Sequence, residues 1–241
     1  MRIERAVQLA IGAALLLCPR SLRFRAALHI AKRLELMLRW LGRSSSQFLP
    51  FDGYREVALQ HAYRGMQRLK IEFDPDLKVI GSESIDNGTL IFTGHFGLTG
   101  VFLRWLFDKG KRVSTIMYAP FANPRVLGTL NPIEVIKADS MVLVRVRRRL
   151  AEGGVVVIAL DTSQTSRSWR ALDKPGGLRN VNETAMRFAE RTNVPVLFCS
   201  TRIGDDGNVE ATITHPSWTN STELFDKFCS FLCAEALRIK R

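Results

Sequence analysis

The sequence predicts an α/β protein built on a mainly parallel central sheet that is flanked by helices. Short apolar runs separated by helix-like segments begin near residue 77 and continue toward the C-terminus. This alternation is typical of βαβ units, in which successive strands join one sheet and lie parallel. The expected strands are residues 78–80, 89–93, 113–118, 135–136, 155–160, 194–200 and 209–214.

The length allows one large domain or two small ones, and the composition narrows the choice of partners. The 241 residues are 46% apolar and 24% charged, an ordinary globular mixture. Thirty-five Lys and Arg against 23 Asp and Glu leave a formal charge of +12, which favours anionic partners such as phospholipid, phosphorylated substrates or nucleic acid. Few aromatic residues accompany the basic clusters and no groove-reading motif is present, so we do not expect nucleic-acid binding. The four cysteines lack metal-type spacing and indicate a reduced, intracellular setting.

Residues 1–43 are expected to form a basic amphipathic and apolar helical anchor, and residues 44–241 the α/β domain. The first segment holds nine Lys and Arg but two acids, a net charge of +7. Its apolar run, residues 6–18, is shorter than the about 20 residues that span a bilayer, and it lacks the small residues of a cleavage site. Residues 21–41 place apolar side chains at helical spacing among Arg and Lys, which predicts a helix on the membrane surface. Packing on the protein's own core is the alternative.

Further helices are expected at residues 54–69, 183–190 and 221–241. The last of these carries an apolar stripe, which indicates that it closes one face of the sheet. The stripe consists of Leu224, Phe228, Phe231, Leu232 and Ala236.

A glycine-rich turn after the second expected strand carries the first candidate catalytic residue. His95 stands between Gly94 and Gly97, directly after the run that ends at Thr93. Ligand sites of α/β sheets lie at the carboxyl ends of the strands, where an imidazole can act as a general base toward a hydroxyl. A turn histidine hydrogen-bonded to backbone groups is the alternative. Asp161 follows the 155–160 run in the same way, so we expect it at the same edge of the sheet.

Several short motifs occur in a characteristic order between residues 78 and 218. They are Gly81-Ser82-Glu83, Gly94-His95-Phe96, Tyr118-Ala119-Pro120, Asn123-Pro124, Arg148-Arg149-Leu150, Gly153-Gly154, Leu160-Asp161, Glu183-Thr184-Ala185 and Val194-Pro195-Val196. In sequence and spacing they resemble the lipid A biosynthesis acyltransferases of the lauroyl and myristoyl type. These enzymes belong to the glycerophosphate and lysophospholipid acyltransferase superfamily.

The resemblance implies a glycerophosphate acyltransferase-like fold and an enzyme of lipid biosynthesis. Such an enzyme moves a fatty acyl chain from a thioester of acyl carrier protein or coenzyme A to a hydroxyl of a lipid or glycolipid. It implies attachment to the cytoplasmic face of a bacterial inner membrane, and chemistry that needs no metal or other cofactor.

The same resemblance assigns His95 as the general base but leaves its partner open. The family motif places Asp or Glu five positions after this histidine, where the present chain has Gly100. Asp161 matches the second acidic motif and is a candidate replacement; a cap on the Thr162 or Ser163 amides is the alternative. If no acid replaces it, we expect a catalytically weak homologue that binds lipid or acyl carrier protein.

Two further groups of candidate residues are expected. The candidate substrate contacts are Asn123, Arg125, Lys137, Thr99 and Pro195. The candidate contacts with an acidic carrier protein or with phospholipid are Arg145, Arg147, Arg148 and Arg149. The alternatives are solvated surface charges, an ordinary proline at the start of a strand, and a charged outer face of the helix before residue 155.

Overall fold

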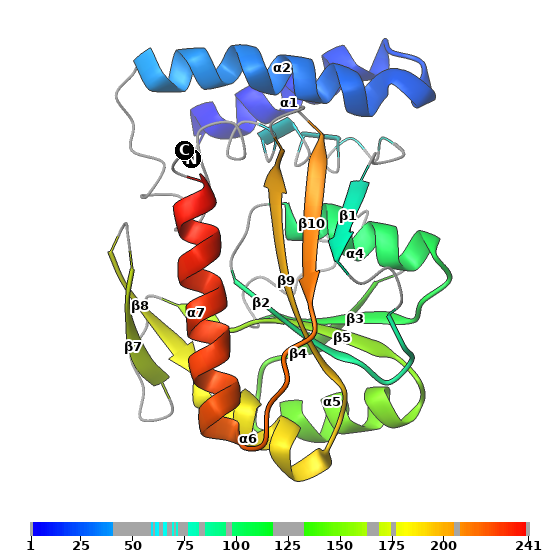
Figure 1. Ribbon diagram of the computed structural model, residues 1–241. Coiled ribbons are helices and arrows are strands. Elements are labelled where there is room, and N and C mark those ends of the chain that lie inside the picture. The colour runs from blue at the N-terminus through cyan, green and yellow to red at the C-terminus, as the bar shows by residue number, and fades with distance from the viewer. Residues whose placement is uncertain are drawn as a thin grey trace.

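The computed structural model describes residues 2–40, 59, 61–62, 65–66, 69, 71, 77–81, 85–94, 98–117, 133–162, 169–174, 177–204 and 208–239 (Figure 1). The helices in this part are α1 (Arg2–Leu16), α2 (Arg20–Trp40), α4 (Thr99–Asp108), α5 (Val142–Ala151), α6 (Glu183–Thr192) and α7 (Ser221–Ile239). The strands are β1 (Leu77–Gly81), β2 (Leu90–Thr93), β3 (Val113–Met117), β4 (Glu134–Lys137), β5 (Val155–Ala159), β6 (Asp161–Thr162), β7 (Trp169–Lys174), β8 (Gly177–Asn182), β9 (Val196–Ile203) and β10 (Val209–Thr214).

A seven-stranded sheet forms the centre, in the order β1-β10-β9-β2-β5-β3-β4. The strands from β9 to β4 pair in parallel, whereas β10 is antiparallel to β9 and parallel to the edge strand β1. Five residues connect β9 to β10. This connection is too short for the crossover that parallel strands need, so β10 runs antiparallel to β9. The prediction of an α/β protein with a mainly parallel sheet flanked by helices is confirmed.

The strand boundaries follow the apolar runs with two departures. β9 begins at Val196 rather than at residue 194 and continues to Ile203. Proline lacks a backbone N–H, and Pro195 instead uses its carbonyl to accept from Leu90 N at 2.9 Å. The second departure is a three-stranded sheet, β6-β8-β7, which was not predicted. Its sequences are rich in Asp, Asn, Lys and Arg, so they lack the apolar pattern that marks a buried strand.

Helices cover both faces of the central sheet. On one face α5, α6 and α7 share a cluster with β2, β5 and β9. In that cluster the ring of Phe228 on α7 lies 5.9 Å from the ring of Phe92 and 5.1 Å from that of Phe198. On the opposite face α4 packs through Phe102, Leu103 and Leu106. The expected closure of the sheet by the C-terminal helix is confirmed (Figure 1).

The start of α7 is fixed by a reciprocal capping arrangement. Asn220 Oδ1 accepts from Glu223 N at 2.9 Å, and Glu223 Oε2 accepts from Thr219 N and from the Thr219 hydroxyl, each at 2.9 Å. A hydrogen bond from Lys227, together with those from Thr219, lowers the pKa of Glu223 from its ordinary 4.5 to about 2. The folded state therefore holds this carboxylate ionised well into acid.

We expect the stability that Glu223 contributes to be fully present above about pH 4.5 and to be lost as the pH falls toward 2. The pKa is lower in the folded chain than in the unfolded chain, so acid favours unfolding. A Glu223→Gln variant should show a flatter fall in urea midpoint between pH 5 and pH 2 than the wild type. Glu190→Gln, a change of an exposed carboxylate on α6, is the control. The same slope in all three proteins would contradict the expectation.

The helices α1 and α2 lie across the ends of β9 and β10 (Figure 1). Pro19 separates them, because proline cannot continue α1. Their buried apolar residues share a cluster with the start of α4 and the adjoining ends of β9 and β10. The members of this cluster on the two helices are Ile11, Leu15, Phe24, Ala27 and Ala31, and those on the other three elements are Leu98, Val101, Ile203 and Val209. One side of each N-terminal helix is therefore packed on the protein's own core.

Close backbone contact fixes α1 to a second helical segment. A Cβ at Gly65 would lie 2.1 Å from the Gln8 carbonyl oxygen, and a Cβ at Gly12 would lie 2.7 Å from the Gly65 carbonyl oxygen. Gln8 Nε2 and His61 Nδ1 are hydrogen-bonded at 3.1 Å. The described positions of the expected 54–69 helix, from Leu59 to Met66, are helical. Among the described helices, none has both the length and the apolar content that crossing a membrane requires.

Candidate functional site

The neighbouring strands β2 and β5 bring two chain segments to one edge of the central sheet. Thr93, the last residue of β2, is in register with Ala159, the last residue of β5. The ladder continues one step further, because Leu160 N donates to the Thr93 carbonyl at 2.9 Å. Gly94 and Asp161 follow directly at the carboxyl ends of these strands, where sheets of this kind hold their ligands.

Asp161 is the most deeply buried carboxylate at this edge. Its exposed fraction is 0%, and it pairs with Val181 in the small sheet. Asn182 N also donates to the Leu160 carbonyl at 3.0 Å, which ties β8 to the end of β5. Asp161 and Thr162 form strand β6, and Ser163, whose amide the capping alternative involves, lies outside the described residues. Its burial at the carboxyl end of the sheet, where ligand sites lie, makes Asp161 a candidate functional group.

The residues around the first candidate base are described only in part. His95 itself lies outside the described residues. Thr99 and Gly100 are the first two residues of α4 and are half-buried. Gly100 thus occupies the first turn of the helix without a side chain, and any acid that orients a base at this edge must come from another element.

A further buried carboxylate, Glu235 on α7, was not predicted from the sequence as a candidate site residue. It is 3% exposed and accepts a hydrogen bond from the Ser200 hydroxyl at 2.6 Å. The signal was available, because Glu235 follows Leu232 by three positions and so continues the apolar stripe of the helix. Burial, with a smaller contribution from Glu235, raises the pKa of the Cys199 thiol far above its usual range. That thiol stays protonated and is not a nucleophile.

Glu235 contacts β9, which is not the strand that leads to Asp161. Thr93 is in register with Cys199 as well as with Ala159. Cys199 packs in the cluster on the α4 face, whereas the next residue, Ser200, contacts α7 on the other face. Glu235 therefore lies on the α7 face of the sheet at β9, whereas Asp161 follows β5, and β2 stands between these two strands.

The other candidate substrate contacts are dispersed. Lys137 is the last residue of β4 and is exposed at the same edge as Asp161, but β3 stands between β4 and β5. Pro195 is exposed at the amino end of β9, so it lies at the opposite edge of the sheet. Asn123 and Arg125 lie outside the described residues. The structure brings Thr99 and Lys137 to the Asp161 edge but does not bring Pro195 there.

The arginine cluster lies on α5 and is largely paired within the molecule. Arg145 bonds to Asp139, Arg148 Nε donates to Glu152 at 2.8 Å, and Arg149 pairs with Glu134 and with Glu152. The guanidinium of Arg145 lowers the pKa of Asp139, and that of Arg148 lowers the pKa of Glu152. Arg147 is exposed and has no ion-pair partner in the described part of the chain. Because most of these arginines are paired within the protein, α5 is better interpreted as a helix with a charged outer face than as a docking surface for a carrier protein or phospholipid.

Comparisons with known proteins do not assign the chain to a family. No protein-family model matches the chain, and no curated protein matches it. Within the described ranges, no three His, Cys, Asp or Glu side chains gather as a metal site would require.

Proposed function

We propose that the protein is a membrane-associated O-acyltransferase of lipid biosynthesis. It would move a fatty acyl chain from a thioester of acyl carrier protein or coenzyme A to a hydroxyl of a lipid or glycolipid, at the cytoplasmic face of the inner membrane. One observation carries the proposal: Thr93 and Ala159 are in register, and Asp161 is fully buried two residues beyond Ala159. His95 stands the same two residues beyond Thr93 in the sequence. Asp161 is thus the acid that replaces Gly100.

In this proposal the chemistry is carried by the two side chains. The His95 imidazole takes the proton of the acceptor hydroxyl while that oxygen attacks the thioester carbonyl. The Asp161 carboxylate holds the imidazole in one tautomer and stabilises the imidazolium. The tetrahedral intermediate then collapses, the carbon–sulfur bond breaks, and the departing sulfur receives the proton from His95. The products are an ester and a free thiol.

Acyl transfer with labelled acyl carrier protein or acyl coenzyme A and a membrane lipid extract tests the activity. We expect His95→Ala to retain no more than about 1% of wild-type transfer, since a general base typically contributes about 10²- to 10⁴-fold. His215→Ala, a change of an exposed histidine, is the matched control and should transfer normally. Equal transfer by wild type and His95→Ala would exclude the proposed role of this histidine.

The turn between α1 and α2 supports attachment to a membrane surface. The hairpin tip, defined as Leu16, Leu17 and Leu22, has exposed fractions of 49%, 88% and 50%. Arg20 and Arg25, also exposed, lie beside these leucines in the sequence. Apolar side chains bordered by cations suit the boundary between acyl chains and anionic headgroups. Because one side of each helix packs on the core, the exposed tip is the part of this hairpin that we assign to the lipid contact.

Substitution of the hairpin tip tests this contact. We expect Leu16→Ser/Leu17→Ser/Leu22→Ser to weaken binding to vesicles containing anionic phospholipid by about 10- to 100-fold, measured by co-flotation. Removal of residues 1–41 is a poorer test, because it would also strip Ile11, Leu15 and Phe24 from the core.

The matched control is Met141→Ser/Val144→Ser, which removes two exposed apolar side chains from α5. That variant should bind vesicles as the wild type does. A tip variant that floats with vesicles as well as the wild type would place the membrane contact elsewhere.

The second candidate function is a homologue without catalysis that binds lipid or acyl carrier protein. The half-buried Gly100 in the first turn of α4 favours it, because the family's orienting acid is missing there. Vesicle or carrier binding without transfer by the wild type would establish this function in place of the first.

A further inference from the structure

A buried hydroxyl on β9 lies near the candidate catalytic edge and has no role in the reaction described above. Thr201 is 0% exposed, and its Oγ1 atom has no hydrogen-bond partner in the described part of the chain. Burying a hydroxyl without a partner costs free energy, so most buried polar groups in proteins are hydrogen-bonded. An unpartnered hydroxyl at a ligand-binding edge is therefore a candidate contact for a bound molecule.

The strand order brings Thr201 close to the point where the chain leaves β2. Thr93, the last residue of β2, is in register with Cys199 of β9. Thr201 stands two residues beyond Cys199, as His95 stands two residues beyond Thr93 in the sequence. The two neighbours of β2 are β9 and β5, and neighbouring strands are about 4.8 Å apart. Thr201 and Asp161 therefore flank the chain on opposite sides where it leaves β2.

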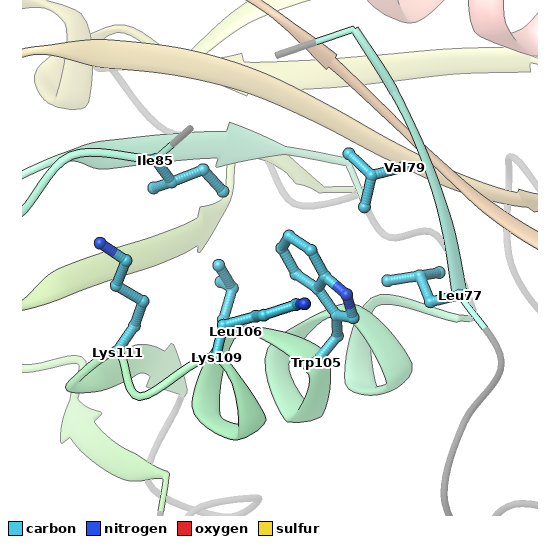
Figure 2. Close-up of a pocket in the computed structure, with 7 residues that line it drawn as sticks. All are labelled: Leu77, Val79, Ile85, Trp105, Leu106, Lys109 and Lys111. Atoms are coloured by element: carbon cyan, nitrogen blue, oxygen red, sulfur yellow. The ribbon is translucent and has the colours of Figure 1, made fainter. Parts of the chain in front are cut away.

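The first turns of α4 lie over this part of β9. Thr201 is in register with Ala211, a member of the cluster that contains Phe102 of α4. Ile203, two residues further along the same face of β9, shares a cluster with Leu98 at the start of α4. The last turns of α4 instead line a pocket with β1, which is a separate feature (Figure 2). Thr201 therefore lies beneath the N-terminal end of α4, the positive end of the helix dipole.

We propose that the Thr201 hydroxyl donates a hydrogen bond to the thioester carbonyl oxygen as that oxygen becomes negative in the tetrahedral intermediate. The inference rests on the proposed acyl transfer and adds a third residue to His95 and Asp161. A threonine hydroxyl is too weak an acid or base to move a proton here, but it is a good donor to an oxyanion, which the α4 dipole also favours. No bond to Thr201 forms or breaks, and its proton stays on Oγ1.

Thr201→Val tests the role, because valine keeps the shape of threonine and lacks the hydroxyl. We expect kcat for transfer from labelled acyl carrier protein or acyl coenzyme A to fall by about 10²- to 10³-fold. The KM of the donor should change little, because the hydrogen bond is strongest in the transition state. The melting temperature should equal or exceed that of the wild type, because the lost hydroxyl has no partner in the folded protein. Thr201→Ser keeps the hydroxyl and should restore most of the transfer.

Thr212→Val is the matched control, because the Thr212 Oγ1 atom is also buried without a partner among the described residues. Thr212 lies between Ala211 and Ile213, which face α4, so its side chain is on the opposite face of β10. This variant should transfer as the wild type does. Equal kcat in the wild type and Thr201→Val, with or without a lower melting temperature, would overturn the inference and leave the proposed function in place. No transfer by the wild type would overturn the proposed function and the role of Thr201 with it.

Discussion

Replacement of Asp161 by asparagine is expected to lower kcat for acyl transfer by about 10²- to 10⁴-fold while the protein stays folded. The amide has nearly the same shape as the carboxylate but no negative charge. It can neither stabilise the imidazolium of His95 nor enforce the tautomer that accepts the hydroxyl proton. The measurement is the rate of labelled ester formation at saturating donor, with the melting temperature recorded on the same preparation.

Glu235→Gln is the control for this experiment, because it neutralises another deeply buried carboxylate. Glu235 contacts Ser200 on β9, and β2 stands between β9 and the strand β5 that leads to Asp161. We expect its replacement to change stability but to leave kcat within a small factor of wild type. Normal transfer by Asp161→Asn together with loss of transfer by Glu235→Gln would show that Glu235, and not Asp161, is the orienting acid.

Replacement of Gly65 by alanine is expected to destabilise the protein by about 1–3 kcal/mol and to loosen α1. The added Cβ would lie 2.1 Å from the Gln8 carbonyl oxygen, so the two backbones must separate. Alanine favours an isolated helix over glycine by about 1 kcal/mol. A loss of stability would therefore report the crossing contact rather than helix propensity. Thermal or urea unfolding measures the loss, and hydrogen exchange measures protection of α1.

Gly110→Ala is the control, since no atom lies within 4 Å of its added Cβ. Its expected loss of stability, about 1–2 kcal/mol, comes only from placing alanine in the left-handed backbone conformation at φ +76°. Hydrogen exchange in α1 should stay slow in Gly110→Ala and become fast in Gly65→Ala. Slow exchange of α1 in both variants would contradict the fixed packing of this helix.

The central strands were predictable because strands covered on both faces are continuously apolar. The only polar residue of Leu90–Thr93 is its terminal Thr93, and Val155–Ala159 has none, so both were predicted as strands. The small sheet was not predictable, because β7 and β8 are held by backbone pairing between polar sequences. The segment on which α1 packs also escaped prediction, although packing of the N-terminal segment on the core was the stated alternative. It depends on Gly12 meeting Gly65, a contact between distant segments that no local pattern encodes.

The candidate site was predictable to the level of the sheet edge. Asp161 follows a buried strand, and that is enough to place it at the carboxyl edge. Pro195 directly precedes β9, so its place at the amino edge of the sheet also follows from the sequence. That place does not agree with the substrate contact expected for Pro195. The relation of Asp161 to Thr93 required the strand order, because β2 and β5 are neighbours only through a crossover. Glu235 required recognition of a carboxylate on an otherwise apolar helix stripe.

A double-mutant cycle tests most directly whether His95 and Asp161 act as one unit. Acyl transfer would be measured for the wild type, His95→Ala, Asp161→Asn and the variant with both changes. If the carboxylate acts only through the imidazole, the double variant should be no slower than His95→Ala alone. Rate losses that multiply in the double variant would show that the two residues act independently and would contradict the proposed pair.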